Sequence, residues 1–367
     1  MLTELKKTIR VFRTRRLVLE FDKIPFYFKD LSWKRLINWF IAETSCKLKL
    51  PFALAYPTLF QIEPTNLCNL RCPICYTISD NRPRDSMSFD EFKRLIDEIG
   101  DYTLLLQLWG WGEPFMNKDF CKMIRYAKDT GMKIITSTNG HFFENEHDVD
   151  ELIDSGLDVL MFSLDGLDAG TYEKYRRHGD FNRVMTALKR LTQRKQQRNA
   201  LFPIINLRMV VTRDNEYQAD QMKKLGEEVG ADVLTFKTLW NIDMSADIET
   251  LLPENPEYRR ARYKQGGEAI RIPNSCRRFW NNPVVYRDGT VVPCYFHSAG
   301  YSLGNVFSED SHGVRRVWFG RLYNKLRLQF VKKQLVDSPC SRCVLNFAEV
   351  DHFASHAFWY HPCPESF

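Results

Sequence analysis

The sequence predicts an α/β fold: a partial (β/α)6 TIM-like barrel, preceded by a helical N-terminal arm and followed by a small α+β domain. Short apolar strands alternate with amphipathic helices from about residue 57 to about residue 237, as in a parallel sheet covered by helices. Six such units are too few for a complete eight-stranded barrel. A chain of 367 residues, 44% hydrophobic and 27% charged, can bury a core of this size and divide into two or three units. We place these units at residues 1–55, 56–245 and 246–367.

The first unit carries all of the excess positive charge. Residues 1–50 hold twelve Lys or Arg and five Asp or Glu, a net charge of +7, whereas the other 40 basic and 41 acidic residues give −1. Two segments have helical spacing of apolar residues, at 2–12 and, after a Ser32 cap, at 33–41. Basic residues beside large aromatic residues suit a membrane surface or an anionic substrate carrier. An arm packed on the barrel with its charges in water is the alternative.

The barrel itself is predicted from hydrophobic periodicity. Its strands are expected at residues 58–62, 104–109, 133–137, 157–163, 204–211 and 233–237. Helices are expected at residues 89–99, 120–129, 149–155, 181–194 and 219–229, and Ser88 is a suitable N-cap for the first of them. The carboxyl ends of parallel strands meet at one edge, so the functional groups are expected there.

A cysteine-rich loop follows the first of these strands. Cys68, Cys72 and Cys75 are separated by three and then two residues. Thiolates are soft ligands, and this close spacing favours zinc or an iron–sulfur cluster. Structural zinc needs four ligands, and no fourth Cys or His lies nearby. Three thiolates would leave one iron of a four-iron cluster open. A zinc site, or three unrelated thiols, is the alternative.

The run from Cys68 to Tyr76 resembles the CxxxCxxC loop of the radical S-adenosylmethionine (SAM) enzymes. The resemblance implies that SAM chelates the open iron of a [4Fe–4S] cluster and is cleaved by one electron from it. The resulting 5′-deoxyadenosyl radical would take a hydrogen atom from the substrate. The same resemblance implies an open partial barrel, with SAM contacts at the strand ends.

Four segments carry these implied SAM contacts. The segment Gly110-Trp111-Gly112-Glu113-Pro114 resembles the GGEP segment that binds the SAM amino group, although Trp111 stands between the glycines. Glycines let a ligand approach the backbone, and a carboxylate can hold an ammonium group. The other segments are 136–140, the SLDG run 163–166 and an arginine after it, for which Arg176 and Arg177 are near-equal candidates. The implied cofactor contacts are Tyr76, Gly110, Gly112, Glu113, Pro114, Ser137, Asn139, Ser163, Asp165 and Arg176.

The C-terminal third holds a second cysteine constellation. Cys276 and Cys294 precede the pair Cys340 and Cys343, and residues 286–294 read as a β-hairpin with an Asp-Gly turn. This arrangement resembles the SPASM and twitch extensions of radical SAM enzymes, and implies one auxiliary [4Fe–4S] cluster held by these four thiolates. A zinc ribbon is the alternative.

Cys363 stands between two prolines near the end of the chain. A frayed terminus is the simplest interpretation. The alternative is a tail folded over the cavity, where Cys363 would be catalytic as a hydrogen donor, as thiols are in radical SAM epimerases.

These patterns together predict an enzyme, a radical SAM oxidoreductase or maturase. Its auxiliary cluster would transfer electrons during the oxidation or bond-forming modification of a small-molecule or peptide substrate. A redox-neutral epimerase and a non-catalytic iron–sulfur electron carrier or scaffold are the alternatives. The segments 112–114 and 163–166 argue against a carrier, because a carrier needs no SAM site.

Partners and location follow from the same observations. The resemblance implies an external one-electron reductant such as flavodoxin or ferredoxin. The basic arm suggests an anionic substrate, such as a nucleotide- or lipid-linked sugar, or peripheral contact with the inner membrane surface through residues 1–50. No apolar run approaches the roughly 18 residues of a membrane span, no signal-peptide pattern is present, and the cysteines cluster at metal-ligand spacings. We expect a cytoplasmic protein and no nucleic-acid partner.

Overall fold

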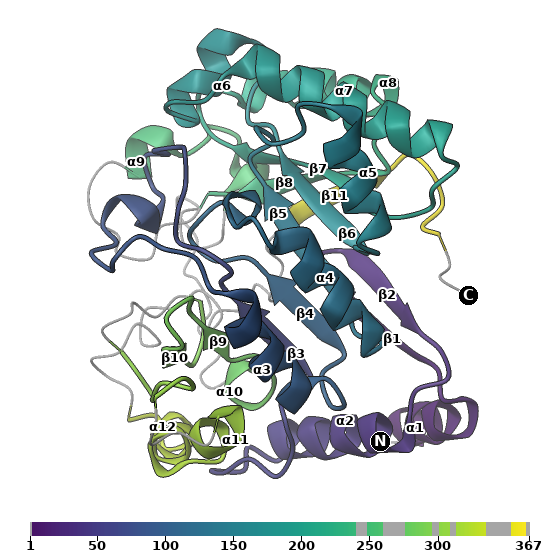
Figure 1. Ribbon diagram of the computed structural model, residues 1–367, viewed down its shortest axis with the longest axis vertical. Coiled ribbons are helices and arrows are strands. Elements are labelled where there is room, and N and C mark those ends of the chain that lie inside the picture. The colour runs from purple at the N-terminus through teal and green to yellow at the C-terminus, as the bar shows by residue number, and fades with distance from the viewer. Residues whose placement is uncertain are drawn as a thin grey trace.

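In the computed structural model a nine-stranded sheet runs through the centre of the molecule (Figure 1). The structure describes residues 2–239, 248–259, 276–295, 301–308, 313–334 and 354–364. The strand order is β10-β9-β3-β4-β5-β6-β7-β8-β11, and strands β3 to β8 are parallel neighbours. The six-stranded partial barrel predicted from the sequence is therefore confirmed.

The barrel elements lie close to their predicted positions. Its strands are β3 (Leu59–Ile62), β4 (Leu105–Leu108), β5 (Lys133–Thr138), β6 (Val159–Ser163), β7 (Ile204–Val211) and β8 (Val233–Thr238). Its helices are α3 (Phe89–Ile99), α4 (Phe120–Asp129), α5 (Glu146–Asp154), α6 (Ala169–Tyr175), α7 (Phe181–Gln197) and α8 (Ala219–Glu228), with short 3-10 turns η1 (Tyr76–Ile78), η2 (Pro114–Met116) and η3 (Glu216–Gln218). Ser88 caps α3 in a reciprocal capping box with Glu91.

Alternate residues of the barrel strands pack into two different hydrophobic clusters, one on each face of the sheet. In β4, Leu106 and Leu108 pack with the helices, whereas Leu105 faces the opposite side of the sheet. This alternation follows from the two-residue period of a strand. The inner side would be an exposed apolar surface unless another segment covered it.

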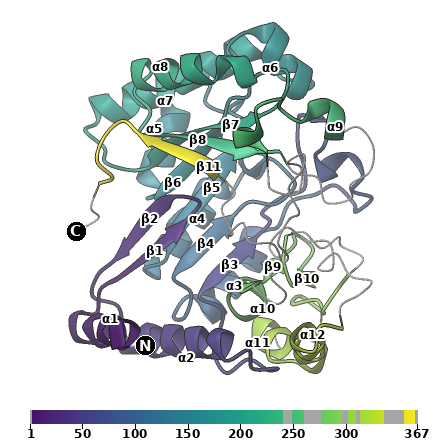
Figure 2. The same ribbon diagram turned by 180° about the vertical axis from the view of Figure 1, so that it is seen from behind.

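The N-terminal arm supplies that cover, through a β-hairpin that the sequence did not predict. Between the expected helices α1 (Leu2–Thr14) and α2 (Trp33–Lys47), strands β1 (Leu17–Phe21) and β2 (Ile24–Phe28) pair antiparallel. Their buried side chains pack against the inner layer of β4 to β8, and Figure 2 shows the hairpin on the face opposite α3 and α4. Its Asp-Lys turn lacks the glycine that usually signals such a hairpin, so the sequence pattern did not reveal it.

The C-terminal segment extends the same sheet at both edges. It contains α9 (Ile248–Leu251), η4 (Pro256–Tyr258), α10 (Arg278–Asn281), β9 (Val284–Val285), β10 (Val291–Val292), α11 (Gly313–Trp318), α12 (Arg321–Val331) and β11 (Ala354–Trp359). The predicted Asp-Gly hairpin is β9–β10, and β9 joins β3 in parallel, whereas β11 pairs antiparallel with β8. The strands of the expected third unit are thus part of the barrel sheet, and a boundary near residue 245 stays a prediction.

The helices α1 and α2 lie end to end along one end of the molecule (Figures 1 and 2). Within the described part of the chain, no helix combines the length and the apolar character that crossing a membrane requires.

Candidate active site

A cavity of about 220 Å³ opens at the carboxyl ends of the barrel strands. The structure brings ten of the predicted residues to its wall: Cys68, Cys72, Cys75, Gly110, Gly112, Glu113, Ser137, Asn139, Ser163 and Arg176. The other three predicted cofactor contacts, Tyr76, Pro114 and Asp165, are not among the described residues of the wall. Segments distant in sequence therefore converge where parallel strands end.

The thiols of the cysteine loop are partly to fully buried at this cavity. Burial raises the pKa of Cys68 to about 12 and also raises the pKa of Cys72, so both stay protonated until a metal displaces the protons. Among the described residues, no three His, Cys, Asp or Glu converge as ligands of a single metal ion. An iron–sulfur cluster does not require its thiolates to converge on one metal ion, because each thiolate binds a different iron. Three thiols around one cavity fit a cluster better than zinc.

The two glycines of the 110–114 segment face protein rather than open space. A Cβ atom on Gly110 would lie 2.6 Å from the Cβ of Glu63, and one on Gly112 would lie 2.6 Å from the carbonyl oxygen of Leu67. The backbone N–H of Glu113 donates to that same carbonyl at 2.7 Å. The glycines thus let this segment pack directly against the chain that leads into the cysteine loop.

Glu113 is the buried carboxylate of the cavity, 3% exposed. It accepts hydrogen bonds from the backbone N–H of Asn139 at 2.7 Å and from the Thr138 hydroxyl at 3.0 Å. Burial raises the pKa of Glu113 to about 7 against the opposing effect of these hydrogen bonds. The charge of Arg176 also lowers this pKa, although less than the hydrogen bonds do. A buried carboxylate at the cavity can receive an ammonium group from a ligand.

Asn139 joins the end of β5 to the cysteine loop. Its side-chain amide donates to the Asn69 side-chain oxygen at 2.7 Å, and its own oxygen lies 3.0 Å from the His141 ring nitrogen Nδ1. Asn69 was not singled out in the sequence, because no pattern connects it to residue 139.

Ser163 and Asp165, both implied by the resemblance as cofactor contacts, occupy different positions. Ser163 lines the wall, whereas Asp165 is fully buried, accepts the N–H of Val210 at 2.6 Å and forms an ion pair with Arg176. Arg176 lines the cavity with its Nη1 atom 3.8 Å from the Cys72 sulfur. Arg177 is exposed, so of the two candidates only Arg176 is among the described residues of the wall. Asp165 therefore contacts a residue of the cavity wall, Arg176, and is not itself among the described residues of that wall.

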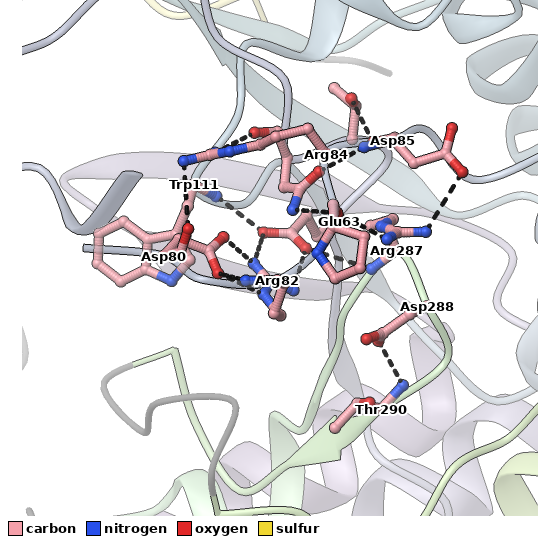
Figure 3. A network of polar contacts seen from close by, with 12 residues as sticks. Glu63, Asp80, Arg82, Arg84, Asp85, Trp111, Arg287, Asp288 and Thr290 are labelled. Atoms are coloured by element: carbon pink, nitrogen blue, oxygen red, sulfur yellow. Dashed lines mark hydrogen bonds and ion pairs between the residues drawn. The ribbon is translucent and has the colours of Figure 1, made fainter. Parts of the chain in front are cut away.

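A buried carboxylate that the sequence did not indicate organises the base of the site (Figure 3). Glu63, fully buried just after β3, accepts two hydrogen bonds from Arg82 at 2.7 and 3.0 Å. It also accepts the backbone N–H of Trp111 at 3.1 Å and that of Arg287 at 3.2 Å. Asp80 shares Arg82 at 2.9 Å. One carboxylate therefore connects the segment that follows the cysteine loop, the 110–114 segment and the C-terminal hairpin.

The structure describes two cysteines of the second constellation, Cys276 and Cys294. Cys276 and Cys294 lie near Tyr323, and burial followed by the influence of these two thiols raises the pKa of Tyr323 against the opposing effect of Arg327. Cys340 and Cys343 lie outside the described residues. Tyr295, next to Cys294, stacks on Trp111 with ring centroids 4.1 Å apart and lines the cavity. The hairpin thus reaches the wall that also holds Cys75.

Cys363 is not brought to this cavity. It packs with the apolar cluster under the hairpin β1–β2, at the amino ends of the strands, and it is absent from the described cavity wall. Its thiol lies 3.9 Å from the carbonyl oxygen of Pro364. A role as hydrogen donor to a substrate in the cavity finds no support in this position.

Replacing Glu63 by Gln should lower the free energy of unfolding by about 3 kcal/mol, because it leaves the buried Arg82 guanidinium with only Asp80 as counter-charge. Urea unfolding of the purified protein measures this loss. Asp85→Asn is the matched control: its side chain is 69% exposed and lies 3.5 Å from Arg287, so the change should cost less than about 1 kcal/mol. Equal effects of the two substitutions would contradict the central role of Glu63.

Glu113 makes stability depend on pH. With its pKa raised from 4.5 to about 7, the folded protein binds a proton that the unfolded chain releases, so this stability is full below about pH 4.5 and is lost as the pH rises through 7. Between about pH 5 and 8, the cluster-free wild type should lose about 2.5 kcal/mol more than Glu113→Gln. The exposed control Glu20→Gln should follow the wild type. Parallel pH curves for wild type and Glu113→Gln would refute the assignment.

Comparison with known proteins agrees with this site. Residues 62–225 match the radical SAM superfamily, and residues 276–344 match the SPASM iron–sulfur cluster-binding domain. The tungsten-containing aldehyde ferredoxin oxidoreductase cofactor-modifying protein of Pyrococcus furiosus is 26% identical over 322 residues, covering 78% of this chain and 87% of that protein. The PqqA peptide cyclase of Bradyrhizobium diazoefficiens is 23% identical over 318 residues, covering 80% of each chain.

Solved structures share the fold. Streptococcus suis SuiB bound to S-adenosylmethionine aligns with a TM-score of 0.59 at 17% identity, over 89% of this chain and 77% of that one. The family matches confirm the resemblance to radical SAM enzymes with a SPASM extension. The chain belongs to the radical SAM superfamily and carries a SPASM domain, and it is an enzyme that uses a [4Fe–4S] cluster, SAM and an auxiliary iron–sulfur cluster.

Proposed function

We propose that this enzyme is a maturase that oxidises, or forms a bond within, a peptide or a cofactor precursor. The observation that carries the proposal is that the cavity lies between the two cysteine constellations: Cys75 of the first lines it directly, and Tyr295, which follows Cys294 of the second, also lines it. The similar proteins include a peptide cyclase and a cofactor-modifying protein, which supports this substrate range. A small molecule such as a nucleotide- or lipid-linked sugar is the second candidate substrate.

The residues of the wall take distinct roles in this proposal. Cys68, Cys72 and Cys75 would hold the first cluster, and Glu113 would accept the SAM ammonium group. When bound, the cluster and SAM supply the 5′-deoxyadenosyl radical that removes a hydrogen atom. The protein orients the substrate and excludes water from it. The N-terminal hairpin β1–β2 and the buried Glu113 suit these two tasks.

The auxiliary site completes the redox chemistry of the proposal. We infer that one auxiliary [4Fe–4S] cluster is held by Cys276, Cys294, Cys340 and Cys343 and passes an electron to or from the substrate, with flavodoxin or ferredoxin as the external reductant. The epimerase alternative needs a hydrogen donor, and Cys363 packs at the other end of the strands. A mere electron carrier would have no use for the buried carboxylate of Glu113.

Iron analysis tests this assignment. After anaerobic reconstitution, the wild type should contain about eight irons per chain and the Cys68/Cys72/Cys75→Ala variant about four. Acid-labile sulfide should fall in parallel, and SAM-dependent release of 5′-deoxyadenosine should disappear in the variant. About four irons in the wild type and none in the variant would exclude an auxiliary cluster, and with it the proposed oxidation.

We also propose that the helices α1 and α2 rest on an anionic membrane surface. Trp33, Ile37 and Phe40 lie on one face of α2 and are 56, 49 and 42% exposed, and Ile9 of α1 is 56% exposed. Phe12 stacks on Trp33 and meets Phe40 edge-on, which joins the two helices into one patch. Exposed basic residues of α1 accompany it, namely Lys6, Lys7, Arg10 and Arg13. An apolar patch beside basic side chains fits an anionic bilayer.

Vesicle co-sedimentation tests the patch. Wild type should bind vesicles that contain phosphatidylglycerol more tightly than pure phosphatidylcholine vesicles, and the double variant Trp33→Ser/Ile37→Ser should bind about tenfold more weakly. Leu201→Ser is the control, because Leu201 is 66% exposed elsewhere on the molecule. Equal loss in the control, or no preference for the anionic lipid, would refute the proposal.

A further inference from the structure

The tip of the N-terminal hairpin lies inside the active-site cavity. Phe21 and Asp22 belong to the cavity wall, although residues 1–61 precede the radical SAM match. Asp22 and Lys23 form the two-residue turn between β1 and β2, both with positive φ, 55° and 66°. An aspartate tolerates this left-handed conformation better than most residues. The turn therefore places the Asp22 carboxylate at the tip of the hairpin, on the cavity wall.

This tip touches two sides of the open barrel. The Phe21 ring lies 6.1 Å from the ring of Trp109, which follows β4. Asp22 forms an ion pair with Arg208 of β7. Arg208 in turn donates through Nε to the Thr235 hydroxyl at 3.2 Å, so its guanidinium is held in one orientation.

The Asp22–Arg208 ion pair is buried beside the cavity, where its charges are not needed for stability. The two side chains are 1 and 8% exposed, and an apolar pair of similar volume would serve stability at least as well, because burying two charges costs much of what their attraction returns. The pair lies beside Ser163, since Arg208 and Ser163 are partners in the β6–β7 ladder. A recognition role explains why polar groups occupy this position.

A third polar group at the same cavity points to a ligand. Gln107 of β4 is 1% exposed and lines the wall, and its side-chain nitrogen has no hydrogen-bond partner among the described residues. A buried donor without a partner is costly. A carbonyl oxygen of a bound substrate would satisfy it.

We propose that Asp22, Arg208 and Gln107 form a substrate subsite that binds a primary amide group, such as the side chain of an Asn or Gln residue in a peptide. Arg208 donates to its carbonyl oxygen and Asp22 accepts one of its N–H groups, whereas Gln107 donates to a second carbonyl oxygen of the substrate. The ion pair is neutral as a unit, so it offers a donor beside an acceptor, which matches the carbonyl oxygen and the N–H that lie on one edge of a primary amide. A free anion would instead face the Asp22 carboxylate. This inference rests on the proposed function, because it specifies the substrate of that same cavity.

Saturation-transfer NMR on the reconstituted protein, with and without SAM, tests the subsite. The probes are N-acetylglycinamide, an uncharged amide, and acetate, an anion. Wild type should bind the amide in preference to acetate. Gln107→Leu and the double variant Asp22→Asn/Arg208→Gln should each weaken amide binding about fivefold, the effect of one lost hydrogen bond. The double variant removes both charges together, so no buried charge is left unpaired.

Asp30→Asn is the matched control, because Asp30 belongs to the same arm and its side chain is 84% exposed in a pair with Arg15. It should change neither amide nor SAM binding. SAM affinity is measured in parallel and should stay within about twofold in the subsite variants. A larger loss of SAM affinity would assign the pair to the SAM site and overturn the proposal.

Two other outcomes would also overturn it: stronger binding of acetate than of the amide, or amide binding that none of the variants changes. Failure of the wild type to bind SAM would instead contradict the proposed function. The amide comparison without SAM would then still decide whether the subsite exists, so the two failures are distinguishable.

Discussion

The buried carboxylate of Glu63 is the interaction on which the arrangement of the site depends. It ends β3, accepts two hydrogen bonds from Arg82 beyond the cysteine loop, and accepts backbone N–H groups of Trp111 and Arg287. Because a buried carboxylate needs several donors to offset its lost hydration, the three segments that provide them are held in fixed relation. Those segments are the chain just beyond the cysteine loop, the 110–114 segment and the turn of the β9–β10 hairpin.

The open barrel is completed by segments from both ends of the chain. The N-terminal hairpin covers the inner apolar layer of β4 to β8, and the C-terminal segment adds β9 and β10 at one edge of the sheet and β11 at the other. Added strands satisfy the backbone groups that an open edge would leave unpaired. The family core at residues 62–225 is therefore surrounded by parts that have both structural and cavity-lining roles.

The glycines of the 110–114 segment illustrate how one feature can serve binding indirectly. Their missing Cβ atoms make room for Glu63 and for the carbonyl of Leu67, and so bring Glu113 next to the cysteine loop. In the same segment, the Trp111 ring lies between two tyrosine rings. Its centroid is 5.1 Å from that of Tyr76 and 4.1 Å from that of Tyr295. The cavity wall is therefore continuous from the first cluster loop to the hairpin that carries Cys294.

The sequence by itself determined the barrel strands, the three-cysteine loop and the Asp-Gly hairpin, because these depend on local periodicity and on motifs of short range. It indicated Glu113 and Asn139 through the resemblance of their segments to a known family. Only the tertiary structure decided the roles of Glu63, Asp22, Arg208 and Gln107, which become neighbours of the site through contacts between distant segments. It also separated Arg176 from Arg177 and placed Cys363 away from the cavity. Such choices depend on which side chains the packed sheet buries together, and no local pattern along the chain records that.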